Sequence, residues 1–286
     1  MAVLTPEEIA RFHRDGYLKF RRVIDDAQLE RPRAELDRVT RQELEREDFS
    51  DLPPEFAYGH ARKGSQERPR AIHQFVNMWK VNPEFRKVLD NPLVTGAVSD
   101  LMDGARLRLW HDQVISKPPG ENALFNCHHD FYFWPVDRPR MISCWLALDD
   151  ATPDNGCMHV GPGSHRDPRY QPVGCDLSEE LHLSPAPLGP GEPASLYQEV
   201  RKWGPNDTTP VQLKAGECMF HHCLNYHLTP ENVTDRQRRA LVMIFMPDGT
   251  RYNHLQSPNH PCTNYLHPED GVALNGDNFP LCGAPA

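Results

Sequence analysis

The 286-residue sequence predicts an α+β protein in which helices come first and an antiparallel β-barrel or sandwich follows. Three observations predict this fold class. Helical periodicity is confined to the first hundred residues, and short strand-like runs begin at Arg106. The chain also has 28 prolines. Because proline is excluded from helix interiors and central strands, this frequency favours a loop-rich, strand-rich architecture over a helical bundle.

Three helical segments are expected in the N-terminal part of the chain. Thr5-Pro6-Glu7-Glu8 begins the first, with threonine as N-cap, proline at the first helical position and the second glutamate closing a capping box. Residues 25–47 carry apolar side chains every three to five positions, and Pro53-Pro54 ends this second segment. Residues 83–102 form the third segment.

Strand-like runs, in which apolar residues alternate or are continuous, follow at residues 107–115, 141–148 and 239–246. Pro153-Asp154-Asn155-Gly156 predicts a turn, and its Asn-Gly pair is a hairpin signal. Residues 211–220 predict a hairpin around the turn Lys214-Ala215-Gly216-Glu217. These runs supply the β core of the expected fold.

We expect one domain over residues 1–286. Residues 1–104 are its mostly helical support, residues 105–250 its β core and residues 251–286 a C-terminal tail. Residues 166–209 are rich in proline, glycine and charge and lie between strand-like regions. A long loop inside a compact domain is usually functional or disordered, so this segment predicts a lid-like insert.

Composition and charge argue against several kinds of partner. The formal net charge is −9, which disfavours binding to a phosphate backbone. No apolar stretch approaches the roughly 20 residues of a membrane helix, and the N-terminus lacks a signal-peptide core. The eight cysteines form no C-x2-C pair, so buried reduced thiols are expected rather than a zinc knuckle. The sequence thus predicts a soluble, cytoplasmic protein without nucleic-acid or membrane partners.

His128 and Asp130 are the first candidates for a metal site. On a strand, alternate side chains point to the same face, so these two would converge and His129 would point away. A second histidine from elsewhere would complete a triad of two imidazoles and one carboxylate. Such a facial triad leaves three positions open on an octahedral metal, which suits iron(II) oxygenases.

The third ligand has three downstream candidates, namely His221, His222 and His227. A joint pattern favours His227, because Thr229 follows it closely and Arg238 lies eleven residues beyond it at the head of an apolar strand. An arginine directed into an apolar barrel requires an anion, since a buried unpaired charge is costly. A dicarboxylate cosubstrate would provide that anion. His221 and His222 are expected to be supporting or structural residues.

A longer series of ordered motifs, over roughly residues 4–247, resembles the phytanoyl-CoA dioxygenase family. The motifs are Leu4-Thr5-Pro6-Glu7-Glu8-Ile9, Asp15-Gly16-Tyr17, Asp112-Gln113, Lys117-Pro118-Pro119-Gly120, His128-His129-Asp130-Phe131, Cys144-Trp145-Leu146-Ala147-Leu148-Asp149-Asp150, Asn155-Gly156-Cys157, Gly161-Pro162-Gly163-Ser164-His165, and His227 with Asn232 and Arg238. The chain departs from the family pattern at two places. It has His227-Leu228-Thr229 where His-Gly-Ser is usual, and His129 where glutamine is common.

The resemblance implies a single phytanoyl-CoA dioxygenase-like domain. Its fold would be a double-stranded β-helix, the cupin-like jelly roll, with flanking N-terminal helices. The family's metal ligands fall on His128, Asp130 and His227. Its 2-oxoglutarate contacts fall on Gln113, Trp145, Thr229 and Arg238. Trp145 and Gln113 also have a simpler interpretation as core and strand residues.

The implied activity is that of an Fe(II)- and 2-oxoglutarate-dependent dioxygenase. Such an enzyme would use O2 to hydroxylate an aliphatic carbon of a small-molecule metabolite, with release of succinate and CO2. Two alternatives are a non-oxygenase metal-dependent enzyme on the same jelly roll and a non-catalytic family member. Neither the insert at residues 166–209 nor the tail carries a substrate motif, so an acyl-CoA and a free metabolite fit the sequence equally.

Overall fold

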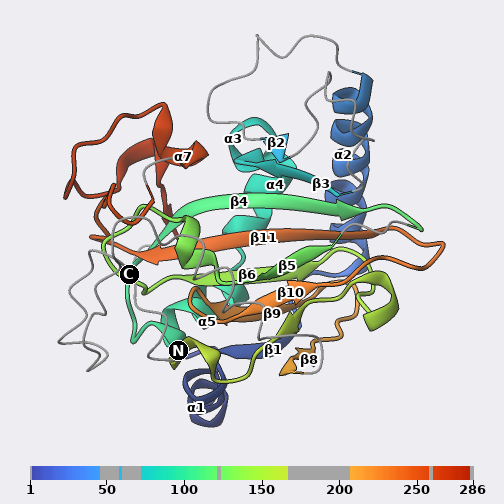
Figure 1. The fold of residues 1–286 in the computed structure, drawn as a ribbon, viewed down its shortest axis with the longest axis horizontal. Helices are drawn as coiled ribbons and strands as arrows, with labels where there is room; N and C mark the ends of the chain where they lie inside the picture. Colours follow the sequence, from blue (N-terminus) through green and yellow to red (C-terminus); the bar gives the residue numbers. More distant parts are fainter. Residues whose placement is uncertain are drawn as a thin grey trace.

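The computed structural model describes residues 2–45, 58–59, 72–120, 124–166, 207–257 and 260–283. Helices and two antiparallel sheets make up this part of the chain (Figure 1). The helices are α1 (Pro6–Asp15), α2 (Asp26–Glu45), α3 (Met78–Val81), α4 (Pro83–Leu89), α5 (Pro92–Leu101) and α7 (Pro261–Asn264). The strands are β1 (Tyr17–Arg22), β2 (Tyr58–Gly59), β3 (His73–Val76), β4 (Leu107–Lys117), β5 (Phe125–His128), β6 (Ile142–Ala147), β7 (His159–Val160), β8 (Thr209–Pro210), β9 (Glu217–His222), β10 (His227–Thr229), β11 (Arg238–Pro247) and β12 (Leu281–Cys282).

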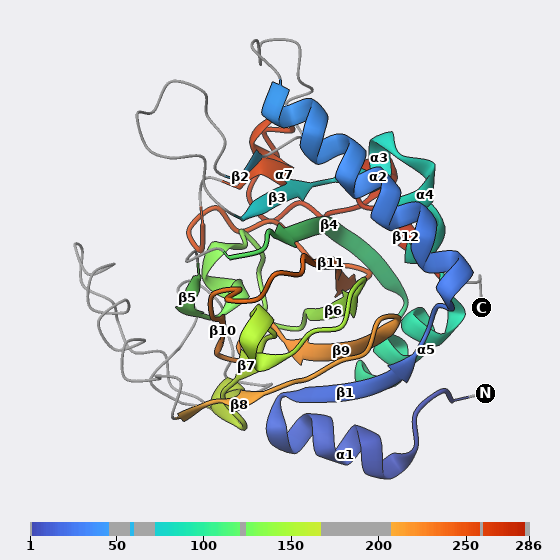
Figure 2. The ribbon, with the colours of Figure 1, turned by 90° about the vertical axis from the view of Figure 1, so that its right-hand side faces the viewer.

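The larger sheet has eight strands, in the order β1-β9-β6-β11-β4-β3-β2 with β12 also paired to β4. The smaller sheet has the order β5-β10-β7-β8. Figure 2 shows the larger sheet curving around the smaller one, with α1, α2, α4 and α5 along its outer side. Side chains from both sheets line one cavity of about 690 Å³. The α+β class with antiparallel sheets is therefore confirmed.

Strand β11 shows how the sequence builds a sheet that is buried on both faces. Leu241, Met243 and Phe245 belong to the apolar cluster that includes the buried faces of the helices. Val242 and Ile244 belong to a second cluster, on the side of the smaller sheet. Since alternate residues of a strand point to opposite faces, a continuous apolar run is what a central strand between two layers requires.

The predicted start of the first helix is confirmed. Thr5 Oγ1 accepts a hydrogen bond from the Glu8 amide at 3.2 Å, and the Glu8 carboxylate accepts one from the Thr5 amide at 2.9 Å. The second predicted helix corresponds to α2, and the runs at 107–115, 141–148 and 239–246 correspond to β4, β6 and β11. Pro53-Pro54 and residues 167–206 of the predicted insert lie outside the described residues.

The prediction of one helix over residues 83–102 is wrong, because the segment divides into α4 and α5. Pro92 has no amide hydrogen to continue a helix, and the side chain of Asn91 caps the new one by accepting from the Leu93 amide at 3.0 Å. The helical reading of the first hundred residues also missed β1 and β3, which pair with β9 and β4.

Both predicted hairpins are absent from the described structure. Residues 153–156 do form a turn, and Gly156 has a φ of 81°, but the flanking β6 and β7 belong to different sheets. In the second case β9 begins only at Glu217, and the preceding β8 pairs with β7 instead. Local turn signals were correct here, whereas long-range pairing decided the partners. Among the described helices, none is long and apolar enough to cross a membrane.

Candidate active site

His128, Asp130 and His227 lie together at the small sheet. Strand pairing brings the two histidines opposite each other, because His227 of β10 is in register with His128 of β5. Oδ1 of Asp130 lies 3.8 Å from Nε2 of His128 and 3.6 Å from Nε2 of His227. The ligand-type atoms of all three residues lie within 4.8 Å of one another, close enough to hold one metal ion.

The carboxylate of Asp130 is held by two side chains of the larger sheet. Its Oδ2 accepts from Ser143 Oγ and from His221 Nε2, each at 3.1 Å, which leaves Oδ1 facing the two histidines. Burial by itself would raise the pKa of Asp130, but His227 and His221 beside it hold the pKa below its ordinary value. The group is therefore ionised, as a metal ligand must be.

The tautomer of His227 also suits a metal ligand. Its Nδ1 lies 3.0 Å from the carbonyl oxygen of Asn225, and since a carbonyl only accepts, Nδ1 carries the proton. Nε2 is then unprotonated and faces Asp130 Oδ1. Burial lowers the pKa of His227 to about 3, so the ring is neutral. A backbone carbonyl that orients a histidine in this way is typical of metal sites.

The strand argument for the pair at 128 and 130 is only partly right. Strand β5 ends at His128, and Asp130 is the first residue of a short 3₁₀ helix, Asp130–Phe133. The two side chains converge nonetheless. His129 points away, as expected, and its Nδ1 accepts from the Tyr132 amide at 3.3 Å, which caps the 3₁₀ helix.

Arg238 is fully buried at the start of β11 and has no hydrogen-bond partner among the described residues. Its guanidinium lies 5.4 Å from the centre of the Trp145 ring. Thr229 Oγ1 is likewise buried without a partner in the described chain. Burial lowers the pKa of Arg238 to about 10, so the side chain stays charged at neutral pH. A buried cation in this state requires an anion.

All seven residues predicted from the sequence line the same cavity: Gln113, His128, Asp130, Trp145, His227, Thr229 and Arg238. The amide oxygen of Gln113 accepts from the side chain of Gln74 on the neighbouring strand. Its own amide nitrogen therefore remains as a donor on the cavity wall. The structure therefore brings the whole predicted set together in one cavity.

The sequence missed or left open three neighbours of the site, which are His221, Ser143 and Lys117, and it also left open the role of His222. His221, which is expected to be a supporting or structural residue, contacts the Asp130 carboxylate. His222 instead accepts a hydrogen bond from the Leu224 amide at 3.1 Å. Ser143 was not considered. Lys117 was predicted only as part of a motif, yet its buried Nζ donates to the carbonyls of Thr229 and Pro230. Strand alternation from Gln113 would have placed Lys117 on the cavity face.

The donor set fits the group that these observations imply. Two imidazoles and an ionised carboxylate suit iron(II). The Arg238 guanidinium and the Thr229 hydroxyl, which have no partner among the described residues, suit a carboxylate of a bound organic acid. Together they define the class of a mononuclear metal enzyme with an anionic cosubstrate.

Comparison with known proteins agrees with this class. The family model for phytanoyl-CoA dioxygenase (PhyH) matches residues 12–240. The chain is 24% identical to the peroxisomal phytanoyl-CoA dioxygenase of Rattus norvegicus over 256 residues, which cover 87% of this chain and 70% of that protein. It is 26% identical to the ectoine dioxygenase of Stutzerimonas stutzeri (strain A1501) over 284 residues, covering 97% and 86%.

A solved structure shares the fold over nearly its whole length. It is the non-heme alpha-ketoglutarate-dependent carbocyclase SnoK from nogalamycin biosynthesis, with a TM-score of 0.73, 23% identity, and coverage of 99% of this chain and 98% of that one. The chain belongs to the phytanoyl-CoA dioxygenase family. It is an enzyme of the 2-oxoglutarate-dependent dioxygenase class, with iron(II), 2-oxoglutarate and O2 as its cofactors and cosubstrates, as the sequence predicted.

Proposed function

We propose that this protein is a hydroxylase that oxidises an aliphatic carbon of a small-molecule metabolite. The observation that carries the proposal is the buried guanidinium of Arg238, which has no hydrogen-bond partner among the described residues and lies in the same cavity as the His128, Asp130 and His227 cluster. A metal site alone does not need that cation, whereas a metal site with a dicarboxylate cosubstrate does.

The proposal includes a fold and a domain division. We propose a double-stranded β-helix in one domain, with residues 1–104 as support, residues 105–250 as the core and residues 251–286 as the tail. The two facing antiparallel sheets and the cavity between them support this. The lid-like insert predicted at residues 166–209 belongs to the same proposal, and its residues 167–206 lie outside the described part of the chain.

In this proposal each site residue has a defined task. His128, Asp130 and His227 hold iron(II), while Ser143 and His221 keep the Asp130 carboxylate turned toward it. When bound, iron(II) and 2-oxoglutarate supply the oxidative chemistry that consumes O2 and yields succinate and CO2.

Arg238 and Thr229 would bind the distal carboxylate of 2-oxoglutarate. The buried guanidinium can offer two parallel donors and the hydroxyl a third. Gln113 would donate to the same cosubstrate from β4, and Trp145 would support the guanidinium with its ring face. Lys117 holds the β10 backbone in place by its bonds to Thr229 and Pro230.

The experiment compares Asp130→Ala and His227→Ala with wild type and with His254→Ala, whose side chain is about half exposed and pairs with Asp270. Metal content is measured after anaerobic loading with Fe(II), and succinate is measured over a panel of small metabolites and acyl-CoA thioesters. We expect both site variants to lose iron and substrate-dependent succinate, and the control to retain both. Retention of most activity in either site variant would reject the triad.

The same experiment separates the alternatives. Iron binding without 2-oxoglutarate consumption would indicate a non-oxygenase metal enzyme, and loss of both in the wild type would indicate a non-catalytic member. The relatives' names point to different substrates, phytanoyl-CoA in one case and ectoine in another. The substrate panel therefore includes both chemical classes.

A further inference from the structure

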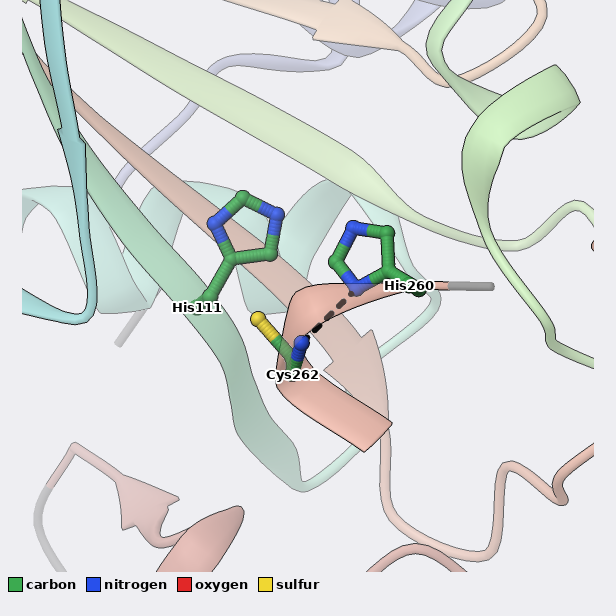
Figure 3. A group of neighbouring side chains, drawn as sticks. All are labelled: His111, His260 and Cys262. Atoms are coloured by element: carbon green, nitrogen blue, oxygen red, sulfur yellow. Dashed lines mark hydrogen bonds between the residues drawn. The ribbon is translucent and has the colours of Figure 1, made fainter. Parts of the chain in front are cut away.

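Two histidines face each other on the wall of the same cavity, at a distance from the proposed 2-oxoglutarate end. His111 lies on β4 and His260 precedes α7, and their ring centres are 5.4 Å apart (Figure 3). Both are buried, with exposed fractions of 4% and 8%, and both line the cavity. The fully buried Cys262 lies beside them, and ligand-type atoms of the three residues lie within 4.8 Å of one another.

The pair lies at the opposite end of β4 from Arg238. Strand pairing places Arg238 across from Lys117 and His111 across from Ile244. His111 and Lys117 are six positions apart, which corresponds to roughly 20 Å along a strand. A molecule that extends from the metal cluster away from Arg238 would therefore meet the two histidines.

Backbone contacts determine the tautomer of each ring. His111 Nδ1 lies 3.1 Å from the carbonyl oxygen of Asp112, so Nδ1 carries the proton and Nε2 is an acceptor. His260 Nδ1 accepts from the Cys262 amide at 3.2 Å, so the proton is on Nε2, which is a donor. Figure 3 shows the remaining ring nitrogens of the two histidines turned toward one another. One side of the pair thus donates and the other accepts.

Both rings are uncharged and held in place. Burial lowers the pKa of His111 to about 4 and the pKa of His260 well below its ordinary value. The ring centres of Trp110 and His260 are 5.1 Å apart, and those of Trp134 and His111 are 6.4 Å apart in a T-shaped arrangement. The pair is therefore a fixed, neutral donor and acceptor at neutral pH.

The acceptor is left without a donor. His111 Nε2 is buried and has no hydrogen-bond partner within the described ranges. Leaving such an atom unsatisfied costs about 1–3 kcal/mol, so a bound group that donates to it gains affinity. A carboxylate would accept from His260 but repel the His111 lone pair, and an ammonium would oppose the His260 N–H. A hydroxyl group satisfies both with a single oxygen atom.

A metal ion fits the same three side chains less well. Coordination by His260 Nε2 would move the ring proton to Nδ1, which would then face the Cys262 N–H donor to donor. The cap of α7 would be lost, and burial raises the pKa of the Cys262 thiol well above its ordinary value, which opposes the thiolate that a metal requires. The hydroxyl needs neither change.

We propose that His111 and His260 bind a hydroxyl group of the substrate, with His260 Nε2 donating to the oxygen and the hydroxyl donating to His111 Nε2. The inference rests on the proposed function in that it takes this cavity as the substrate cavity. It assigns the substrate class: a molecule that carries an uncharged hydroxyl group at the end remote from Arg238.

The test measures binding rather than turnover, so it remains readable if no oxidation is found. Cyclohexanol, cyclohexanecarboxylate and cyclohexylammonium are titrated by calorimetry into anaerobic protein loaded with Fe(II) and 2-oxoglutarate. We expect the alcohol to bind at least fivefold more tightly than either charged probe. Equal or tighter binding of a charged probe would overturn the proposal.

Two variants remove one function each. His111→Phe removes the acceptor and keeps a ring, while His260→Asn keeps a cap for α7 and removes the Nε2 donor. Each should lower alcohol affinity about fivefold to tenfold, the effect of one hydrogen bond, and His254→Asn should not. An alcohol preference that survives in either folded variant refutes the pair.

Two further measurements test the proposal without relying on the folding of the His111 and His260 variants. Ring ¹⁵N shifts of the wild-type protein should show His111 protonated at Nδ1 and His260 at Nε2 throughout pH 6–8, and the opposite tautomer in either ring would refute the pair. Titration with Co(II) beyond one equivalent should produce no thiolate charge-transfer band. A band that Cys262→Ser abolishes would establish a metal site in place of the hydroxyl site.

Discussion

The replacement Arg238→Met should make the protein more stable and at the same time poorer at binding 2-oxoglutarate. The guanidinium is fully buried and has no hydrogen-bond partner in the described part of the chain. Its pKa is lowered from 12.5 to about 10, which corresponds to about 3 kcal/mol of unfavourable burial of the charge. Methionine removes that charge and keeps apolar volume at the site.

Binding should change in the opposite direction. Removing one partner of a buried charge pair costs about 2–5 kcal/mol, so the Kd for 2-oxoglutarate should rise roughly 30-fold to several thousand-fold. Iron content should stay near wild type, because Arg238 is not part of the His128, Asp130 and His227 cluster. Calorimetry of the anaerobic Fe(II) protein measures Kd, and urea unfolding without 2-oxoglutarate measures stability.

Arg239 provides a matched control on the next position of β11. Its guanidinium pairs with Asp149 at 2.8 Å and with Asp37 at 2.8 Å, on the helix side of the sheet. Arg239→Met should therefore lower stability and leave the Kd unchanged. If Arg238→Met destabilised the protein, or bound 2-oxoglutarate like wild type, the assignment of an anion to this cation would be wrong.

Three further outcomes are expected. Ser143→Ala should weaken iron affinity about 10–100-fold, measured by metal titration, since Ser143 orients Asp130; unchanged affinity would mean that this bond does not support the metal. Burial raises the pKa of Asp112 from 3.8 to about 8, so the folded protein keeps this carboxyl protonated at pH values where the unfolded chain ionises it. The free energy of unfolding is therefore highest below about pH 4 and falls as the pH rises to about 8. The free energy of unfolding of Asp112→Asn, measured in urea, should thus rise by about 2–4 kcal/mol relative to that of wild type between pH 5 and pH 8. A difference between the two proteins that does not change with pH would contradict this. Gly156 has a φ of 81°, and a Cβ there would meet the Pro230 carbonyl oxygen at 2.6 Å. Gly156→Ala should lower stability by about 1–3 kcal/mol in the same assay, and wild-type stability would show that the turn tolerates a side chain.

Most of the candidate site was readable from local sequence patterns. The spacing of His128 and Asp130, and the position of Arg238 at the head of an apolar run, indicated the chemistry of the cavity. The resemblance added Gln113 and Trp145, which line the same cavity. Their roles at the metal and at 2-oxoglutarate remain proposals.

The supporting residues were not readable, because they depend on strand register. Ser143 and His221 are opposite one another in the β6–β9 pair, and only this register turns both toward Asp130. The predictions of the two hairpins were wrong for a related reason. A turn sequence determines that the chain reverses, but the burial of both faces of a sheet determines which strand it joins.

Periodicity in the sequence by itself determined the α+β class, and the spacing of residue types indicated a metal site with an anion. The resemblance to the phytanoyl-CoA dioxygenase family then implied the particular cofactors. Only the tertiary structure decided that the Arg238 guanidinium has no hydrogen-bond partner in the described part of the chain, that Asp130 is held from the opposite sheet, and that His111 and His260 face each other. His111 and His260 are 149 positions apart in the sequence. Their contact depends on how the C-terminal segment packs against β4, which no local pattern encodes.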